Sequence, residues 1–270
     1  MKSVNTQIKE NRKISEDFYK LRFLWKREWG EPIAGNFCEI KVNGLSAPLL
    51  RRPFAFSDYA GYPKKEDGFF AEIIYQKRGT ATEILTQKAA GENLEIIAPL
   101  GNSFYENTSH KRRIYAVAGG VGFGPILFAA KTAPFPVILL SGFRSKAFVP
   151  QADVFHEIAT KGIKTQICTD DGSDGFHGNV VQFLETTDIN SEDLILACGP
   201  VNMLKALHGF AEKRNITCKV STEEMMACGV GACMGCVILD CEGKHRRVCK
   251  EGPVFNSREL MWQSPTMPLN

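Results

Sequence analysis

The stretch Ile114–Pro125, IYAVAGGVGFGP, decides how the second half of this chain folds. Its first five residues are apolar, as in a buried strand, and four glycines then lead into an apolar segment with a helical pattern. Glycines at such a turn let the backbone approach a pyrophosphate, which the N–H groups and dipole of the helix attract. Strand-to-helix turns also use glycine for packing, and this one does not match G-x-G-x-x-G in full. The stretch predicts a strand–turn–helix unit whose glycines either hold a nucleotide or pack the turn.

Strand and helix patterns continue to alternate after this unit. Strands are expected at 135–143, 164–172 and 193–200, and helices at 124–133, 151–162, 179–187 and 200–215. Strands that alternate with helices imply βαβ units and a parallel sheet.

Two loops follow expected strands and could face a ligand. Cys198–Pro200 ends the last strand, where it would face the crevice, although a simple turn explains it equally well. Arg144, Ser145 and Lys146 follow the second strand, where an adenosine ribose would lie. They could receive a 2′-phosphate or be ordinary solvated charges, and no acidic residue directly follows that strand to indicate NAD. The sequence leaves the choice between NAD and NADP open.

The first hundred residues have a β-rich pattern instead. Short strands separated by turn residues are expected at 6–15, 18–27, 36–42, 69–78 and 92–101. This pattern favours an antiparallel barrel or sandwich. The polar stretch ENTSHKRR, residues 106–113, is a plausible linker to the second half.

One motif in the β-rich half suggests a ligand. In LLRRPFAFS, residues 49–57, the guanidinium of Arg51 or Arg52 fits a pyrophosphate. Pro53 fixes the backbone beside it, and Phe54 could cover a flat ring. Taken alone, a surface arginine pair and a turn explain the motif better.

The segment Met226–Pro253 carries five of the nine cysteines. If Cys241 is left out, the spacing is C-x4-C-x2-C-x12-C, which is typical of a plant-type 2Fe–2S ligand set. A zinc ribbon usually has two C-x2-C pairs and this segment has one, and five clustered cysteines are not a packing pattern. The fourth ligand is Cys249 or Cys241. We favour Cys249, because residues 239–248 resemble a hairpin that returns the chain to the cluster.

Composition excludes several other classes of protein. The chain has 270 residues, 44% of them hydrophobic and 23% charged, which is ordinary for a globular protein. The net charge of +3 and the scattered Lys and Arg residues do not favour nucleic-acid binding. No apolar run approaches the roughly 20 residues that span a bilayer. The polar N-terminus and the odd cysteine count indicate a cytoplasmic protein without a disulfide framework.

Together these features resemble the ferredoxin-reductase superfamily. Within it, the chain is similar to the family of electron-transfer subunits of NAD-linked dihydroorotate dehydrogenases, from about residue 3 to about residue 258. The motifs that carry this resemblance are PIAGNF (32–37), RPFA (52–55), GTAT (79–82), APLGNSF (98–104), GGVGFGP (119–125), CGPVNML (198–204) and STEEMMACG (221–229).

The resemblance implies three redox groups and the residues that hold them. FAD is expected on Arg52, Pro53, Phe54, Ala55, Ile74, Tyr75, Gln76, Ala81 and Thr82. NAD, the substrate, is expected against Gly119, Gly120, Gly122, Gly199 and Pro200, with Cys198 as the catalytic residue near the nicotinamide. The 2Fe–2S cluster is expected on Cys228, Cys233, Cys236 and Cys249. The chain departs from the family where Ala55 replaces a hydroxyl residue and Ala81 replaces a glycine.

The resemblance also implies an architecture and a function. We expect a multi-domain β plus α/β protein: an antiparallel β-barrel for FAD (1–106), a parallel-sheet α/β domain for NAD (107–218), a small 2Fe–2S domain (219–258) and a tail (259–270). Electrons from dihydroorotate, oxidised to orotate in pyrimidine biosynthesis by an FMN-containing catalytic subunit, would pass through the cluster and FAD to NAD. The expected assembly is a heterotetramer, with no nucleic-acid or membrane partner.

Two other functions compete with this one. The same set of domains also fits a reductase subunit linked to ferredoxin, sulfide or a hydrogenase. A non-enzymatic redox sensor could use the cluster as a switch, but the nicotinamide-domain motifs argue against it.

Overall fold

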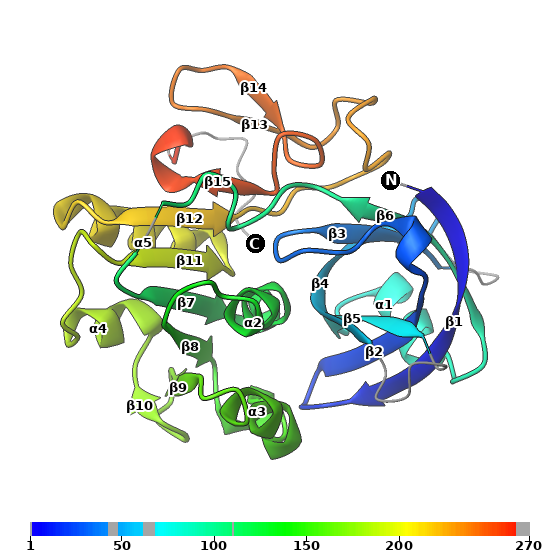
Figure 1. Ribbon diagram of the computed structural model, residues 1–270, viewed down its shortest axis with the longest axis horizontal. Helices are drawn as coiled ribbons and strands as arrows, with labels where there is room; N and C mark the ends of the chain where they lie inside the picture. The colour runs from blue at the N-terminus through cyan, green and yellow to red at the C-terminus, as the bar shows by residue number, and fades with distance from the viewer. Residues whose placement is uncertain (1, 43–47, 62–67, 110, 263–270) are drawn as a thin grey trace.

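The computed structural model describes residues 2–42, 48–61, 68–109 and 111–262. A closed β-barrel lies beside a seven-stranded sheet, and a two-stranded hairpin lies beyond one edge of the sheet (Figure 1). The predicted combination of an antiparallel barrel, a parallel α/β sheet and a small C-terminal segment is confirmed.

The barrel contains the first six strands, all paired antiparallel in the order β1-β2-β5-β4-β3-β6. They are β1 (Lys2–Lys13), β2 (Phe18–Trp25), β3 (Phe37–Lys41), β4 (Arg52–Gly61), β5 (Phe69–Gln76) and β6 (Asn93–Leu100). Alternate apolar side chains, such as Leu21, Phe23 and Ile73, fill the interior because successive residues of a strand point to opposite faces. Helix α1 (Thr80–Thr86) follows β5, and the short helix η1 (Arg27–Trp29) follows β2.

The sheet has the strand order β10-β9-β8-β7-β11-β12-β15. Its strands are β7 (Ile114–Gly119), β8 (Val137–Phe143), β9 (Lys164–Thr169), β10 (Phe176–His177), β11 (Leu194–Cys198), β12 (Thr217–Ser221) and β15 (Val254–Asn256). All are parallel except β15, which pairs antiparallel with β12. After β7 the chain adds β8, β9 and β10 on one side of that strand, and it then adds β11 and β12 on the other side. This change of direction opens a ligand crevice at the carboxyl ends of β7 and β11.

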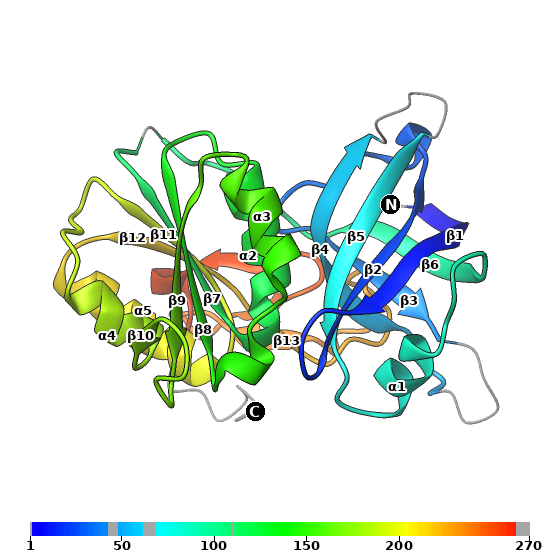
Figure 2. The same ribbon diagram turned by 90° about the horizontal axis from the view of Figure 1, so that it is seen from below.

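Helices cover both faces of the sheet. They are α2 (Phe123–Lys131), α3 (Ala152–Ala159), α4 (Val180–Glu185) and α5 (Val201–Lys213), with short helices η3 (Gly120–Gly122), η4 (Lys146–Phe148) and η5 (Ser257–Glu259). Figure 2 shows α2 and α3 between the sheet and the barrel, and α4 and α5 on the opposite face. Residues 123–130 of α2 are all buried, because the helix packs on the sheet and on β4 together.

A network of ion pairs joins the barrel to the sheet. The Nζ of Lys131, on α2, lies 2.7 Å from Oδ2 of Asp58 on β4 and 3.1 Å from Oε2 of Glu157 on α3. Arg22 of the barrel contacts Glu72 Oε2 at 2.6 Å and Glu157 Oε1 at 3.1 Å. The side chains of Lys131 and Glu72 are almost fully buried. Since a buried charge is costly without its partner, the network favours one orientation of the sheet relative to the barrel.

The C-terminal segment lies between the barrel and the sheet. Strands β13 (Val237–Leu239) and β14 (His245–Arg247) form the predicted hairpin. Barrel residue Asn102 then fixes the following segment: its side-chain amide donates to the carbonyls of Glu251 and Val254, and its Oδ1 accepts from the N–H of Val254. These bonds give a structural reason for the APLGNSF motif, in which Asn102 lies.

The predicted tail is only partly described. Leu260 is buried and bridges to Asp240, and the Trp262 ring stacks on His208 with centroids 5.3 Å apart. Residues 263–270 lie outside the described residues. No helix in the described ranges combines the length and the apolar character that a membrane crossing requires.

Candidate redox site

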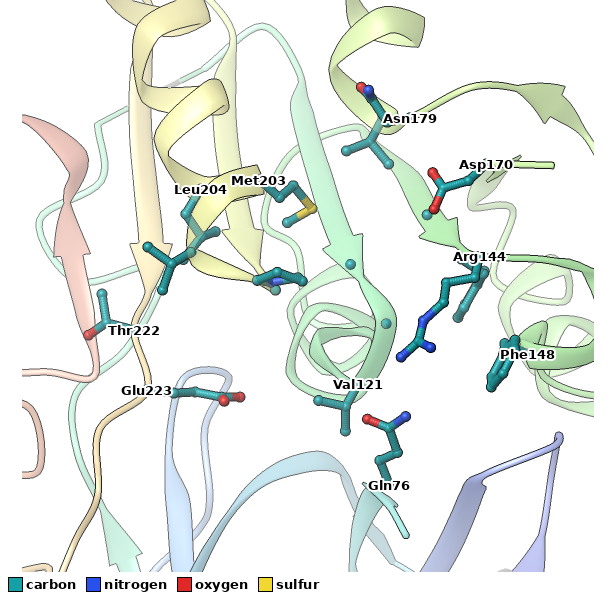
Figure 3. Close-up of a pocket in the computed structure, with 18 of the residues that line it drawn as sticks. Gln76, Val121, Arg144, Phe148, Asp170, Asn179, Met203, Leu204, Thr222 and Glu223 are labelled. Carbon is teal, nitrogen blue, oxygen red and sulfur yellow. The ribbon is translucent and has the colours of Figure 1, made fainter. Parts of the chain in front are cut away.

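Two cavities meet in the crevice between the barrel and the sheet. The larger has a volume of about 360 Å³ and the smaller about 240 Å³. The residues that line both are Gln76, Arg78, Val121, Thr222, Glu223 and Glu224. Figure 3 shows Gln76 and Glu223 entering the larger cavity from different elements, the barrel and the segment after β12. The shared wall means that ligands in the two cavities would lie against each other.

The smaller cavity is lined on the barrel side by predicted flavin residues. Those present are Pro53, Phe54, Ala55, Ile74, Tyr75 and Gln76. The Tyr75 ring stacks on Tyr19 at 5.5 Å and meets Phe54 edge-on at 5.9 Å, and its hydroxyl donates to Asn11 Oδ1. These contacts hold Phe54 and Tyr75 in place. The walls are mainly apolar and partly aromatic, which suits a flat ring such as an isoalloxazine.

Three predicted flavin residues do not line either cavity. The guanidinium of Arg52 donates to the carbonyls of Leu50 and Arg51. Within the described ranges it forms no close ion pair, although its charge acts on the carboxylate of Glu39. Arg51, the other candidate, is ion-paired with Glu95. Of the two arginines, Arg52 is therefore the one available to a phosphate.

Ala81 and Thr82 lie in the first turn of α1. Ala81 is buried, and the Thr82 hydroxyl accepts hydrogen bonds from the N–H groups of Arg78 and Gly79. In this arrangement the Thr82 side chain orders the turn that follows β5.

The glycine-rich turn combines the two roles that its sequence left open. Gly119 and Gly120 line the larger cavity and Gly122 the smaller one. A Cβ at Gly122 would lie 2.1 Å from the carbonyl oxygen of Cys198, and one at Gly119 would lie 2.6 Å from the sulfur of Met203. Position 122 therefore requires glycine for packing, because its obstacle is backbone, whereas a side chain at Gly119 would displace Met203 and Pro200. At Gly120 nothing lies within 4 Å, so this residue leaves space in the cavity.

Cys198 lies where the two cavities approach each other. It lines the smaller cavity, while Gly199 and Pro200 line the larger one. Burial, with a contribution from the Glu223 carboxylate, raises the pKa of the Cys198 thiol far above its usual value, so the thiol is neutral at pH 7. Burial also raises the pKa of Glu223, although Arg78 opposes that change.

Sequence reasoning assigned no role to Arg78 or Glu223. Both lie in segments that it had marked, since Arg78 ends the strand pattern at 69–78 and Glu223 belongs to the STEEMMACG motif. Nothing in the sequence alone showed that these distant segments share one wall.

The four predicted ligand cysteines gather as two pairs. The N–H of Cys233 donates to Cys228 Sγ at 3.4 Å, and the N–H of Cys249 donates to Cys236 Sγ at 3.4 Å. Among the described residues, no three His, Cys, Asp or Glu side chains are grouped as the ligands of a single metal ion. Two thiol pairs match a centre with two irons, each of which takes two thiolates.

Backbone N–H groups point at these sulfurs. Cys228 Sγ accepts from Val230 at 3.5 Å and from Cys233 at 3.4 Å. Partial burial acts to raise the pKa of the Cys228 thiol, but these hydrogen bonds outweigh it and lower the pKa to about 6. The loop can turn this sharply because Gly229 has a φ of +66°, and a Cβ there would lie 2.7 Å from Cγ of Glu39 on the barrel. The loop therefore presents donors to thiolates, as an iron–sulfur site requires.

The hairpin separates Cys249 from Cys241. The register pairs Val237 with Arg247, so that Cys236 and Cys249 both lie just beyond the open end. The N–H of Cys249 donates to Cys236 Sγ at 3.4 Å. Cys241 is exposed at the turn end, where its N–H donates to the carbonyl of Glu259. This geometry favours Cys249 over Cys241 as the fourth ligand.

The cysteine segment also forms part of the smaller cavity. Met226 and Pro253, which flank the cysteines in sequence, line its wall. Consecutive Cα atoms are about 3.8 Å apart, so the Cα of Cys228 lies within roughly 8 Å of that of Met226. Cys228, the first of the predicted ligands, is therefore close to the cavity that suits a flavin.

Comparisons with known proteins agree with this geometry. Residues 223–261 match the family model described as the iron-sulfur cluster binding domain of dihydroorotate dehydrogenase B. The solved structure of the NADH-dependent reduced ferredoxin-NADP oxidoreductase, studied for flavin-based electron bifurcation, has a TM-score of 0.80 at 24% identity over 95% of this chain and 90% of that chain. The ferredoxin reductase of carbazole 1,9a-dioxygenase has a TM-score of 0.64 at 17% identity, covering 80% and 66% of the two chains. These two structures establish the fold.

Curated relatives match over nearly their whole length. A protein of Caldanaerobacter subterraneus is 34% identical over 263 residues, which cover 96% of this chain and 98% of the relative. One of Geobacillus kaustophilus is 35% identical over 262 residues, covering 94% and 96%. Both are named dihydroorotate dehydrogenase B (NAD(+)), electron transfer subunit. This chain belongs to that family of electron transfer subunits and is an oxidoreductase subunit.

Proposed function

We propose that this protein carries electrons between a catalytic partner that oxidises dihydroorotate to orotate and NAD, as a subunit in pyrimidine biosynthesis. The observation that carries the proposal is the shared wall: one crevice joins a cavity for a flat ring, a cavity for a dinucleotide and a loop of paired thiols. The family to which the chain belongs supports the same function.

The smaller cavity suits the flat ring of FAD. Its flat ring would lie against Phe54, Ala55 and the segment Ile74–Gln76, with Pro53 beside it. Arg52 would bind the pyrophosphate, and Ala81 and Thr82 would present the first turn of α1 to it. When bound, FAD exchanges hydride with nicotinamide and single electrons with an iron–sulfur centre.

The larger cavity fits NAD. Gly119 and Gly120 give the pyrophosphate access to the backbone where β7 ends, and Gly122 brings that turn against Cys198. Gly199 and Pro200, between β11 and α5, line the same cavity. The side chain of Gln76, on the wall that the two cavities share, would contact a nicotinamide bound there, and the neutral, buried thiol of Cys198 would lie nearby on the smaller cavity.

Four thiolates fit a 2Fe–2S cluster. We assign Cys228 and Cys233 to one iron, and Cys236 and Cys249 to the other. The N–H groups of Val230, Cys233, Gly235 and Cys249 donate to the sulfurs and stabilise the thiolate form. Arg247 fixes the loop from the hairpin by donating to the carbonyl of Gly231 at 2.8 Å.

The chain divides into units that match these roles. We propose the barrel at 1–106, the nucleotide-binding sheet at 107–218, the cluster segment at 219–258 and a tail at 259–270. Strand β12 crosses the boundary at 218, so the cluster segment continues directly from the sheet. All nine cysteines are free thiols, which supports a cytoplasmic location, where thiols stay reduced.

The proposal includes a partner, because the relatives that support it are named as electron transfer subunits of a dehydrogenase. We expect an FMN-containing catalytic subunit, in a heterotetramer with this chain. The purified chain, containing FAD and the cluster, should oxidise NADH rapidly with a dye as electron acceptor, yet leave dihydroorotate untouched. Addition of the catalytic subunit should start NAD reduction by dihydroorotate.

Spectrophotometry of both reactions tests this expectation. Oxidation of dihydroorotate by the chain alone, or failure of the complex to reduce NAD, would contradict the proposal. Co-purification from the native source identifies the partner. A ferredoxin-, sulfide- or hydrogenase-linked companion would replace the dihydroorotate assignment, and a chain that binds NADH but reduces no dye would indicate a sensor.

A further inference from the structure

The larger cavity extends away from Cys198 across the ends of three strands. Gly119 ends β7, while Gly142 and Arg144 lie at the end of β8 and Asp170 follows β9, and all four line the cavity. Neighbouring strands are about 4.8 Å apart, so β9 lies roughly 14 Å from β11. With the nicotinamide at Cys198, the adenosine half of the dinucleotide must extend toward Arg144 and Asp170 (Figure 3).

The two neighbouring carboxylates after β9 differ in availability. Asp171 accepts hydrogen bonds from the N–H of Ser173 at 3.0 Å and from its hydroxyl at 2.6 Å, and these bonds lower its pKa. The N–H of Asp170 donates to the carbonyl of Phe143 at 3.1 Å, which fixes its backbone against β8. Its carboxylate has no hydrogen bond or ion pair within the described ranges. Asp170 is therefore positioned in the cavity wall with its carboxylate free to bind a ligand.

Arg144, a cation from the adjacent loop, lines the same cavity as Asp170. The Cζ atom of Arg144 lies 5.4 Å from the centroid of the Phe148 ring, which also lines the cavity. The Arg144 carbonyl accepts from the N–H of Asp171, so the two loops are joined. A 2′-phosphate placed here would be attracted by Arg144 and repelled by Asp170, whereas a ribose with two free hydroxyls would donate hydrogen bonds to the carboxylate.

We propose that Asp170 selects NAD over NADP, by accepting hydrogen bonds from the adenosine ribose hydroxyls and repelling a 2′-phosphate. The inference rests on the proposed function, which places the dinucleotide in the larger cavity. In many dinucleotide-binding sheets the acidic residue that recognises the ribose follows the second strand, where this chain has Arg144. In this chain the acidic residue is Asp170, which follows β9.

The test compares NADH with NADPH in the complete chain carrying FAD and the cluster. The kcat/KM for NADH divided by the kcat/KM for NADPH, measured with a dye acceptor, should fall on the order of tenfold or more in Asp170→Asn. The 2′-phosphate of NADPH is then no longer repelled by Asp170, while Arg144 still attracts it. Arg144→Gln should raise the ratio. Asp171→Asn is the matched control, since Asp171 is already bonded to Ser173, and its ratio should stay within about twofold of the parent value.

Calorimetry of AMP and 2′-phospho-AMP supplies a readout that does not depend on turnover. The Asp170→Asn variant should bind 2′-phospho-AMP more tightly than the parent protein does. An unchanged ratio and unchanged affinities in Asp170→Asn, or an equal effect in Asp171→Asn, would overturn the inference alone. If the parent protein binds neither nucleotide nor NADH, the proposed function fails together with it.

Discussion

Gly122→Ala is expected to destabilise the protein and to release its flavin. The backbone of Gly122 has φ −58° and ψ −9°, which alanine adopts without strain. The obstacle is the neighbouring chain: the new Cβ would lie 2.1 Å from the carbonyl oxygen and 2.4 Å from the carbonyl carbon of Cys198. Backbone atoms cannot rotate away as a side chain can, so the turn after β7 must separate from the end of β11. Overpacking of this kind costs about 1–3 kcal/mol.

Thermal unfolding and flavin content measure this effect. At roughly 2–4 °C per kcal/mol, the unfolding midpoint should fall by several degrees. FAD should also be lost on gel filtration, because Gly122 and Cys198 both line the smaller cavity. Gly209→Ala is the control: Gly209 lies in α5 with nothing within 4 Å of the new Cβ, and alanine is the better helix former there. If both variants melt and retain flavin alike, the close approach at Gly122 is not structurally important.

Cys249→Ser is expected to abolish the cluster, while Cys241→Ser leaves it in place. Cys249 is buried beside Cys236, and loss of its thiolate removes one of the two ligands that we assign to that iron. Cys241 is exposed at the far turn of the hairpin. Iron content and visible absorption of anaerobically purified variants should therefore fall to background in the first variant and match the parent protein in the second.

The opposite pattern would identify Cys241 as the ligand. Flavin content provides an internal control in both proteins, because neither cysteine lines the smaller cavity. A Cys249→Ser protein that keeps its FAD but has no iron would show that the barrel and the sheet fold without the cluster.

Elements with local patterns could be predicted from the sequence. Segments rich in β-branched and aromatic residues predicted five of the six barrel strands, but not β4 (Arg52–Gly61). Apolar runs such as Leu194–Cys198 predicted buried parallel strands, and the segment 239–248 predicted the β13–β14 hairpin. The spacing of the cysteines predicted a cluster on four of them; the structure shows two pairs, and the ligand set stays a prediction. These signals come from residues close together in sequence, or from the regular spacing of apolar residues that a strand or helix imposes.

Contacts between distant segments could not be predicted in the same way. Arg78 and Glu223 lie on one wall only because the barrel and the sheet are packed together, partly through the buried pairs of Lys131. In the sequence, a ribose-binding acid is expected directly after the second strand of the sheet, where this chain has Arg144. Asp170 comes from the third, and it reaches the same cavity because β9 is the spatial neighbour of β8.

The most direct test of the central claim, that one crevice joins NAD, FAD and the cluster, is an anaerobic titration of the isolated chain with NADH, followed by visible absorption and electron paramagnetic resonance. The account predicts that NADH bleaches the flavin band and that a reduced 2Fe–2S signal appears without any partner protein. Two results would contradict the account. One is a chain that is colourless and free of iron. The other is a chain whose flavin is reduced while its cluster stays oxidised, even in a large excess of a flavin reductant stronger than NADH.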